Sequence, residues 1–108
     1  MQKSNGILKS DILLFLKILK KDLAKKGIKK IALFGSFSKD SQNIYSDIDI
    51  AIKKEKNFLQ KYSPYYYFEI VSKIKASVRK EFGKNVDVLD LDSKSPFLKS
   101  IEKDIIYV

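Results

Sequence analysis

Residues 33–36 read Leu-Phe-Gly-Ser and residues 46–50 read Ser-Asp-Ile-Asp-Ile, and these two short stretches are the most informative part of the chain. The first ends an apolar strand with a turn in which backbone N–H groups and a hydroxyl can approach phosphate oxygens, because Gly35 has no Cβ. The second alternates carboxylates with isoleucines, which predicts a strand with Asp47 and Asp49 on one face. Two carboxylates so placed can hold divalent metal ions. Together, the two stretches predict a phosphate-binding turn beside a metal-binding strand.

The sequence before this stretch predicts one helix and one strand. Ser10 is expected to cap the helix, with Leu13 at its third position, and Gly27 is expected to end it. Residues 29–34 are expected to form a short buried strand. The apolar side chains of the helix recur at helical spacing and comprise Ile12, Phe15, Leu16, Leu19 and Leu23. They predict one face packed against the sheet.

The segments from residue 36 onward continue the alternation of helix and strand. In order, we expect a short helix and a loop over 36–46, a strand over 47–53, a Lys-rich connection over 54–62, a helix from Ser63-Pro64 to Gly83, a strand over 85–91, a short helix from Ser95-Pro96, and an edge strand over 105–108. This order predicts an α/β fold with a small mixed β-sheet packed against helices, in a single domain over residues 1–108.

The composition excludes several kinds of chemistry. The chain has no cysteine and no histidine, so disulfides, thiolate chemistry, His-based catalytic triads and His-ligated zinc are ruled out. The net charge of +9 comes almost entirely from dispersed lysines, with Arg79 as the one arginine. Lysines spread in this way are typical of solvated surfaces, so we do not expect direct nucleic-acid binding. No apolar run is long enough to cross a membrane, and we expect a cytoplasmic protein.

A third carboxylate supports the metal-site interpretation. Asp87 lies between Val86 and Val88 in a predicted strand, where an ionised side chain costs free energy unless it is paired, protonated or bound to a metal. A salt bridge to a nearby lysine is the alternative for Asp87. Taken alone, a Gly-Ser turn often only ends a strand, and an Asp-x-Asp pair is often only solvated. The combination is more specific than either part.

Gly35-Ser36, Asp47-x-Asp49 and the Val-Asp-Val around Asp87 together resemble the DNA polymerase β nucleotidyltransferase superfamily. In length the chain is similar to its minimal nucleotidyltransferase (MNT) domains, which are often the antitoxins of HEPN/MNT toxin–antitoxin pairs. The resemblance implies a Mg²⁺-dependent protein adenylyltransferase that moves AMP from ATP to a hydroxyl of a HEPN ribonuclease toxin, most plausibly a tyrosine, and so neutralises it.

The same resemblance implies the roles of individual residues. Asp47, Asp49 and Asp87 would be catalytic and hold two Mg²⁺ ions. The nucleotide phosphates would lie against Gly35 and Ser36, assisted by the start of the following short helix. Where minimal family members carry Arg-Gly, this chain has Lys39-Asp40. Lys39 can act as a point charge toward phosphate, although it lacks the bidentate geometry of arginine.

Three alternatives stay open on the sequence alone. The chain could be an antitoxin that neutralises its toxin by binding, with little or no catalysis, because of the change at Lys39-Asp40. It could also be a nucleotidyltransferase that acts on a small molecule or an RNA end. Separately, Tyr65, Tyr66 and Tyr67 could stack on a base or contact a partner, or they could pack at the start of a helix.

Overall fold

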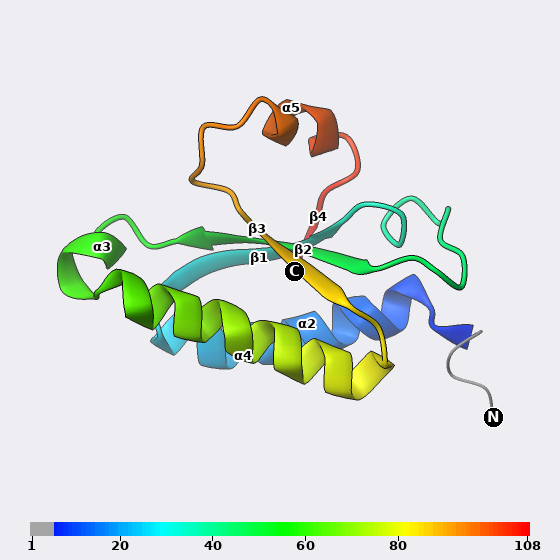
Figure 1. Cartoon of the computed structure of the whole chain (residues 1–108), viewed down its shortest axis with the longest axis horizontal. Coiled ribbons are helices and arrows are strands. Elements are labelled where there is room, and N and C mark those ends of the chain that lie inside the picture. Colours follow the sequence, from blue (N-terminus) through cyan, green and yellow to red (C-terminus); the bar gives the residue numbers. More distant parts are fainter. Residues whose placement is uncertain (1–5) are drawn as a thin grey trace.

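Four strands form one mixed sheet in the computed structural model of the chain, which describes residues 6–108 (Figure 1). The elements are α2 (Lys9–Lys25), β1 (Ile28–Phe34), β2 (Ile48–Lys54), α3 (Phe58–Lys61), α4 (Pro64–Phe82), β3 (Val86–Asp90), α5 (Phe97–Ile101) and β4 (Ile106–Tyr107). The strand order is β3-β2-β1-β4. β1 is antiparallel to β2 and to β4, whereas β2 and β3 are parallel. The predicted mixed α/β sheet is confirmed.

Two helical layers cover opposite faces of this sheet. Helices α2 and α4 lie on one face, and α5 with its flanking segments lies on the other (Figure 1). Alternation along β2 divides its side chains accordingly. The isoleucines Ile48, Ile50 and Ile52 are buried against α2 and α4, and Ala51 is buried in a smaller cluster with Ile101 of α5. The predicted core face of this strand is confirmed, and the acidic positions fall on the α5 face.

Helix α4 begins and ends where the sequence predicts. The Tyr66 N–H donates to the Ser63 hydroxyl at 3.3 Å, and Pro64 is the first helical residue. Gly83 ends the helix with φ of 68°, a left-handed conformation that glycine adopts without strain. The buried residues Ile70, Ile74 and Val78 recur at helical spacing.

The prediction that Ser10 caps the first helix is wrong. Helix α2 begins at Lys9, so Ser10 lies inside its first turn. The preceding N–H, that of Leu8, donates to the carboxylate of Asp11 at 3.2 Å. Asp11 accepts a hydrogen bond from an amide at the start of the helix, and its negative charge interacts favourably with the positive end of the helix dipole. The helix therefore begins before Ser10. The predicted stop holds, since Gly27 follows the helix with φ of 92°.

Two predictions between the strands also need correction. Residues 36–46 contain turns and no helix. One helical turn forms, with the Lys39 N–H donating to the Gly35 carbonyl at 3.2 Å, but Asp40 has φ of 58°, which a right-handed helix cannot continue. The Lys-rich connection over 54–62 contains α3, which places Phe58 in the core. Strands β2 and β3 have bounds one residue away from those predicted.

The C-terminal residues form the predicted edge strand. β4 pairs with β1 through Tyr107 and Ile106, and the Val108 N–H donates to the Ile31 carbonyl at 3.1 Å. The open edge on the opposite side of the sheet belongs to β3. Within residues 6–108 no helix has the length and apolar character needed to span a membrane.

Candidate functional site

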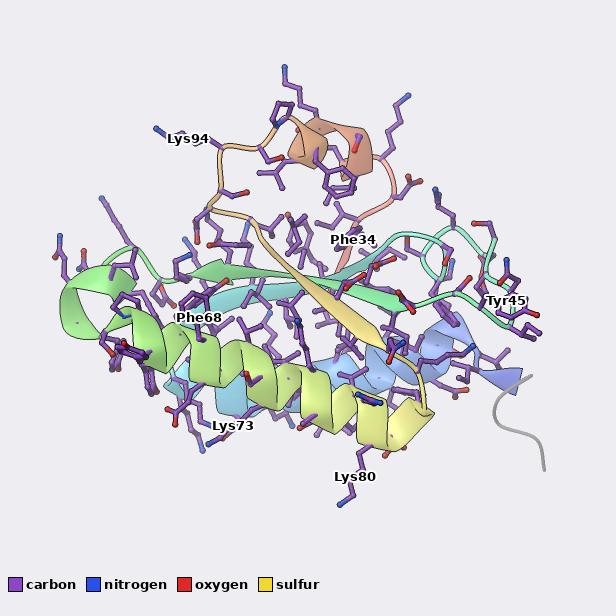
Figure 2. All side chains as sticks on the ribbon, viewed as in Figure 1. Phe34, Tyr45, Phe68, Lys73, Lys80 and Lys94 are labelled. Atoms are coloured by element: carbon purple, nitrogen blue, oxygen red, sulfur yellow. The ribbon has the colours of Figure 1, made fainter. Side chains whose placement is uncertain are left out.

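The three predicted carboxylates lie at one end of the sheet. Parallel pairing of β2 with β3 sets Asp49 directly opposite Asp87. Asp47 precedes β2 by one residue and is exposed. Antiparallel pairing of β1 with β2 sets Phe34 opposite Asp49, so the turn after β1 begins beside the same carboxylate. The segment 35–47 extends from this end of the sheet, and Figure 2 shows Tyr45 at its far tip.

Asp49 is the electrostatic centre of this group. Its pKa is raised to about 6, chiefly because partial burial disfavours the ionised form. The negative charges of Asp87 and Asp47 raise the pKa further, and the Asp87 side chain lies within hydrogen-bonding reach of Asp49. The charge of Lys39 acts in the opposite direction. Burial and the two neighbouring carboxylates therefore outweigh the effect of Lys39 on the pKa of Asp49.

Asp87 does not form the lysine salt bridge considered as its alternative. Among residues 6–108, each ion pair joins a lysine to Asp22, Asp40, Asp90 or Asp92. The carboxylate of Asp87 instead faces that of Asp49. A pair of adjacent carboxylates without a basic partner is a typical arrangement for sharing a proton or binding a cation.

Gly35 is fixed by its contact with Asp49. Its φ is 76°, in the region that favours glycine, and a Cβ at this position would collide with the carboxylate oxygen of Asp49 and lie 2.9 Å from its Cγ. The turn can therefore approach the acidic group only because residue 35 has no side chain. Contact of this turn with phosphate stays a prediction.

Two residues that the sequence reasoning missed shape the turn after Gly35. The buried Ser38 donates its hydroxyl hydrogen to the Gly35 carbonyl at 2.8 Å. Lys9, at the start of α2, donates to the Ser38 carbonyl at 3.2 Å and forms an ion pair with Asp40 at 2.8 Å. Ser38 lies two residues after Ser36, so its place in the turn could have been predicted from the sequence. The contact of Lys9 with this turn is long-range, and no sequence pattern indicates it.

The ion pair with Lys9 accounts for the charge of Asp40, which stands where minimal family members carry glycine. Asp40 is exposed and directs its carboxylate to Lys9, which balances its charge. Its positive φ marks a position that suits glycine and that aspartate also tolerates. Lys39 is exposed and close enough to Asp49 to affect its pKa. The predicted phosphate contacts Gly35, Ser36 and Lys39 thus all belong to the turn beside Asp49.

The donor set of this site fits Mg²⁺, although it is not closed around an ion. Carboxylate oxygens are the ligands that Mg²⁺ prefers in proteins, and the facing pair Asp49–Asp87 supplies them beside an exposed third acid, Asp47. Within the described residues, no three His, Cys, Asp or Glu side chains stand close enough together to form a ready coordination group. A bound cation would favour the ionised form of Asp49, whose pKa is raised by burial and by the charges of Asp87 and Asp47.

The tyrosines Tyr65 to Tyr67 lie away from this site. Tyr66 stacks on Tyr62 with a centroid distance of 4.4 Å, and both contact Phe58, which is anchored by α3 at the other end of the sheet (Figure 1). Tyr67 packs edge-on against Phe58, and Tyr65 is exposed. The packing alternative for this segment is therefore the one that the structure supports, and these rings are not a base-stacking platform at the carboxylates.

Comparisons with known proteins identify the family to which the chain is similar. The family model described as "Polymerase beta, Nucleotidyltransferase" matches residues 16–108. Among curated proteins, "Putative protein adenylyltransferase MJ1379" from Methanocaldococcus jannaschii is 37% identical over 86 residues, which cover 78% of this chain and 80% of that protein. "Putative protein adenylyltransferase MJ0126" from the same organism is 33% identical and spans 92% of this chain and 96% of its own length.

Two solved structures are similar to the fold. A crystal structure of a toxin–antitoxin with AMP-PNP superposes with a TM-score of 0.58 at 26% identity, covering 82% of this chain and 68% of that one. A "putative nucleotidyltransferase" from Sulfolobus solfataricus superposes with a TM-score of 0.56 at 21% identity over 99% of this chain and 87% of that one. The second likeness concerns the fold alone.

Proposed function

We propose that this chain, which belongs to the polymerase β nucleotidyltransferase family, transfers AMP from ATP to a hydroxyl of a partner protein. One observation carries this proposal: Asp49 and Asp87 face each other, with no salt bridge to a lysine among residues 6–108, beside a turn in which Gly35 leaves no room for a Cβ. A phosphate turn next to coupled carboxylates meets the needs of nucleotidyl transfer, which depends on positioning and on charge neutralisation.

The proposed reaction assigns a role to each side of the site. The backbone at Gly35, the Ser36 hydroxyl and the Lys39 ammonium would bind and orient the triphosphate. The acceptor oxygen attacks the α-phosphorus, a new P–O bond forms, and the bond to the pyrophosphate oxygen breaks, so that pyrophosphate leaves. Asp87 would accept the proton of the attacking hydroxyl or pass it to solvent.

Asp47, Asp49 and Asp87 would hold the Mg²⁺ ions that this chemistry implies. When bound, two such ions would neutralise the triphosphate and polarise the reacting phosphoryl group. The chain's own contribution is to fix the carboxylates: Asp49 and Asp87 by the register of two parallel strands, and Asp47 by its place one residue before β2.

The acceptor is proposed to be a HEPN-domain ribonuclease toxin, with a tyrosine hydroxyl as the modified group, in a cytoplasmic toxin–antitoxin pair. Support for a toxin partner comes from the toxin–antitoxin structure with AMP-PNP, and support for a protein acceptor comes from the relatives named as protein adenylyltransferases. Asp40 gives no reason to expect a lost activity, because its charge is directed to Lys9.

The test uses the purified chain with ATP, Mg²⁺ and the protein encoded by the adjacent gene. We expect the partner to gain the mass of one or more AMP groups, and we expect peptide mapping to place them on tyrosine. The Asp47→Ala, Asp49→Ala double variant should lose this transfer while keeping the circular-dichroism spectrum of the parent. If the double variant still neutralises the toxin in cells, inhibition by binding alone replaces the catalytic proposal.

A further inference from the structure

A basic groove continues from the carboxylates to the outer side of α4. It has a volume of about 780 Å³ and passes around the beginning of β3. Asp47 and Asp87 lie at one wall, and the opposite wall is formed by Ser72, Lys75, Ala76 and Arg79 of α4. These four residues recur at helical spacing on one exposed stripe of the helix. The groove therefore connects the proposed reaction centre with a surface that the catalytic roles do not use.

The charged side chains on α4 are available to a ligand. Lys75 and Arg79 are exposed, and among residues 6–108 neither forms an ion pair with an acidic side chain. Lys80 also borders the groove, but its side chain projects away from the sheet (Figure 2). Lys75 and Arg79 thus supply most of the positive charge that faces the groove. Arg79 is the one arginine of the chain, and its planar guanidinium suits bidentate binding of a carboxylate.

The groove reaches the beginning of β3 at Asn85, Val86 and Asp87, and β3 is an edge strand of the sheet. The Ile48 N–H donates to the Asn85 carbonyl, and the Leu91 N–H donates to the Ile52 carbonyl, so the odd-numbered residues of β3 direct their backbone groups to β2. The backbone groups of Val86 and Val88 must then point outward. Among the strands of residues 6–108, β3 pairs with β2 alone, and no backbone hydrogen bond described outside the sheet involves these two amides. An extended peptide can pair with such an edge.

We propose that this groove binds an acidic, extended segment of the acceptor protein, paired with the edge of β3, and brings its hydroxyl to Asp87. The inference rests on the proposed function for the identity of the ligand as the acceptor. Carboxylates of the segment would lie against Lys75 and Arg79. Because Asp87 belongs to the strand with which the segment pairs, the pairing itself would place the acceptor hydroxyl near the Asp87 carboxylate.

A peptide fits the groove better than a single-stranded nucleic acid. Proteins that bind single strands combine positive charge with aromatic side chains on which bases stack. The nine residues that line this groove include no aromatic residue, whereas the open β3 edge offers the hydrogen bonds that a peptide backbone needs. An RNA that competed for the groove would overturn the proposal.

Binding is tested first, without catalysis. The probe is a fluorescein-labelled peptide of alternating glutamate and valine around one tyrosine, and its comparison is the same peptide with glutamine in place of glutamate. At low salt we expect the acidic peptide to bind at least about tenfold more tightly, and we expect Lys75→Glu, Arg79→Glu to abolish that preference. The matched control is Lys17→Glu, Lys21→Glu on α2, with the same charge change, helical spacing and exposure.

Amide hydrogen exchange provides a second readout. Saturating acidic peptide should slow exchange at Val86 and Val88, whose amides face the open edge, and should leave Asp87 and Leu89 unchanged. Equal binding by the groove variant and the control variant would overturn the proposal, as would stronger binding of a poly-uridine RNA. If the chain transfers no AMP to any acceptor but still binds the acidic peptide through Lys75 and Arg79, the proposed reaction fails and the groove assignment stands.

Discussion

The two ends of the β2–β3 pair differ in how their charged residues are paired. At one end, Asp49 and Asp87 face each other, and burial together with repulsion raises the pKa of Asp49. At the other end, the buried ammonium of Lys54 contacts Asp90 at 2.6 Å and Asp92 at 3.3 Å and lies 4.5 Å from the ring centre of Tyr67. Within residues 6–108, one end therefore holds a pair of acids with no salt bridge, and the other end, which includes Asp92 just after β3, holds a network of paired charges.

This difference separates function from stability. Burial alone would raise the pKa of Asp92, but hydrogen bonds from Lys53 and Lys54 outweigh it and lower that pKa. Burial and the nearby Asp90 raise the pKa of Tyr67, which keeps its hydroxyl protonated. The balanced end thus favours the folded state, whereas the acidic end is held together against its own repulsion. An arrangement that costs stability without compensation is a mark of a binding or catalytic site.

The largest expected effect is on the reaction at the acidic end. Asp49→Asn should lower AMP transfer by at least about 10³-fold, because the proposed Mg²⁺ ions would lose a carboxylate ligand. A mass-spectrometric time course of partner modification measures this. The control is Asp22→Asn, the same chemical change at an exposed carboxylate of α2, and it should react at the parental rate. Retention of more than a tenth of the activity by Asp49→Asn would contradict the assignment.

Breaking the balanced end should affect stability instead. Lys54→Met should lower the free energy of unfolding by about 2–3 kcal/mol, because Asp90 and Asp92 lose their buried partner. Urea unfolding measures the change, and the reaction rate per folded molecule should stay within about twofold of the parent at this distance from the site. A parental unfolding midpoint would show that the network contributes nothing net.

The close approach of the turn to Asp49 can be isolated with two glycines. Gly35→Ala should cost about 2 kcal/mol and reduce AMP transfer, because the new methyl group meets the Asp49 carboxylate. Gly83→Ala has a similar positive φ but no atom within 4 Å of the added methyl, so it should cost about 1 kcal/mol and spare activity. Equal losses of stability and of AMP transfer in the two variants would show that the contact between the Gly35→Ala methyl group and Asp49 has no measurable effect.

The two ends should respond to acid in opposite directions. The folded-state pKa of Asp49 is about 6, above its ordinary value of 3.8, so its penalty is absent below about pH 4 and complete above about pH 6. The lowered pKa of Asp92 contributes stability that is lost as the pH falls. In metal-free buffer, Asp49→Asn should therefore exceed the parent in stability by about 1 kcal/mol at pH 7 and by nothing at pH 4. A constant difference between the two urea midpoints would refute the pKa assignment.

The smallest effect is expected at Asp40. Asp40→Gly relaxes the positive φ but removes an exposed ion pair with Lys9, and the two contributions nearly cancel, leaving a change within about 0.5 kcal/mol. AMP transfer should stay within about threefold of the parent. A gain of tenfold or more would show that the aspartate impairs nucleotide binding, which is how the sequence alone could be read.

The sequence was most informative where a local pattern determined the structure. The period-2 alternation around Asp49 and the capping residues Ser63 and Gly83 act over a few residues, so both were predictable. The wrong cap at Ser10 and the helix expected after Ser36 show the limit. In the first case a side chain three residues away satisfied the amide, and in the second a single positive φ at Asp40 ended the turn.

Long-range contacts account for the parts of the site that could not be predicted. The sequence suggested that Asp87 belongs with Asp49, but it could not give the register that sets them opposite each other. It also gave no sign that Lys9 contacts Asp40 across 31 positions. The groove beside Arg79 depends on how α4 packs along β3, which no local pattern of charges specifies.

The parallel register of β2 and β3 has a consequence for insertions and deletions. Side chains alternate faces along a strand, so adding or removing one residue at 83–85 would turn Asp87 toward the helices and set Val86 or Val88 opposite Asp49. The protein could keep its topology and lose its acidic pair in a single step. Tolerance to length changes should therefore be low in this short connection and high at the exposed tip around Tyr45, which makes activity a sensitive reporter of strand register.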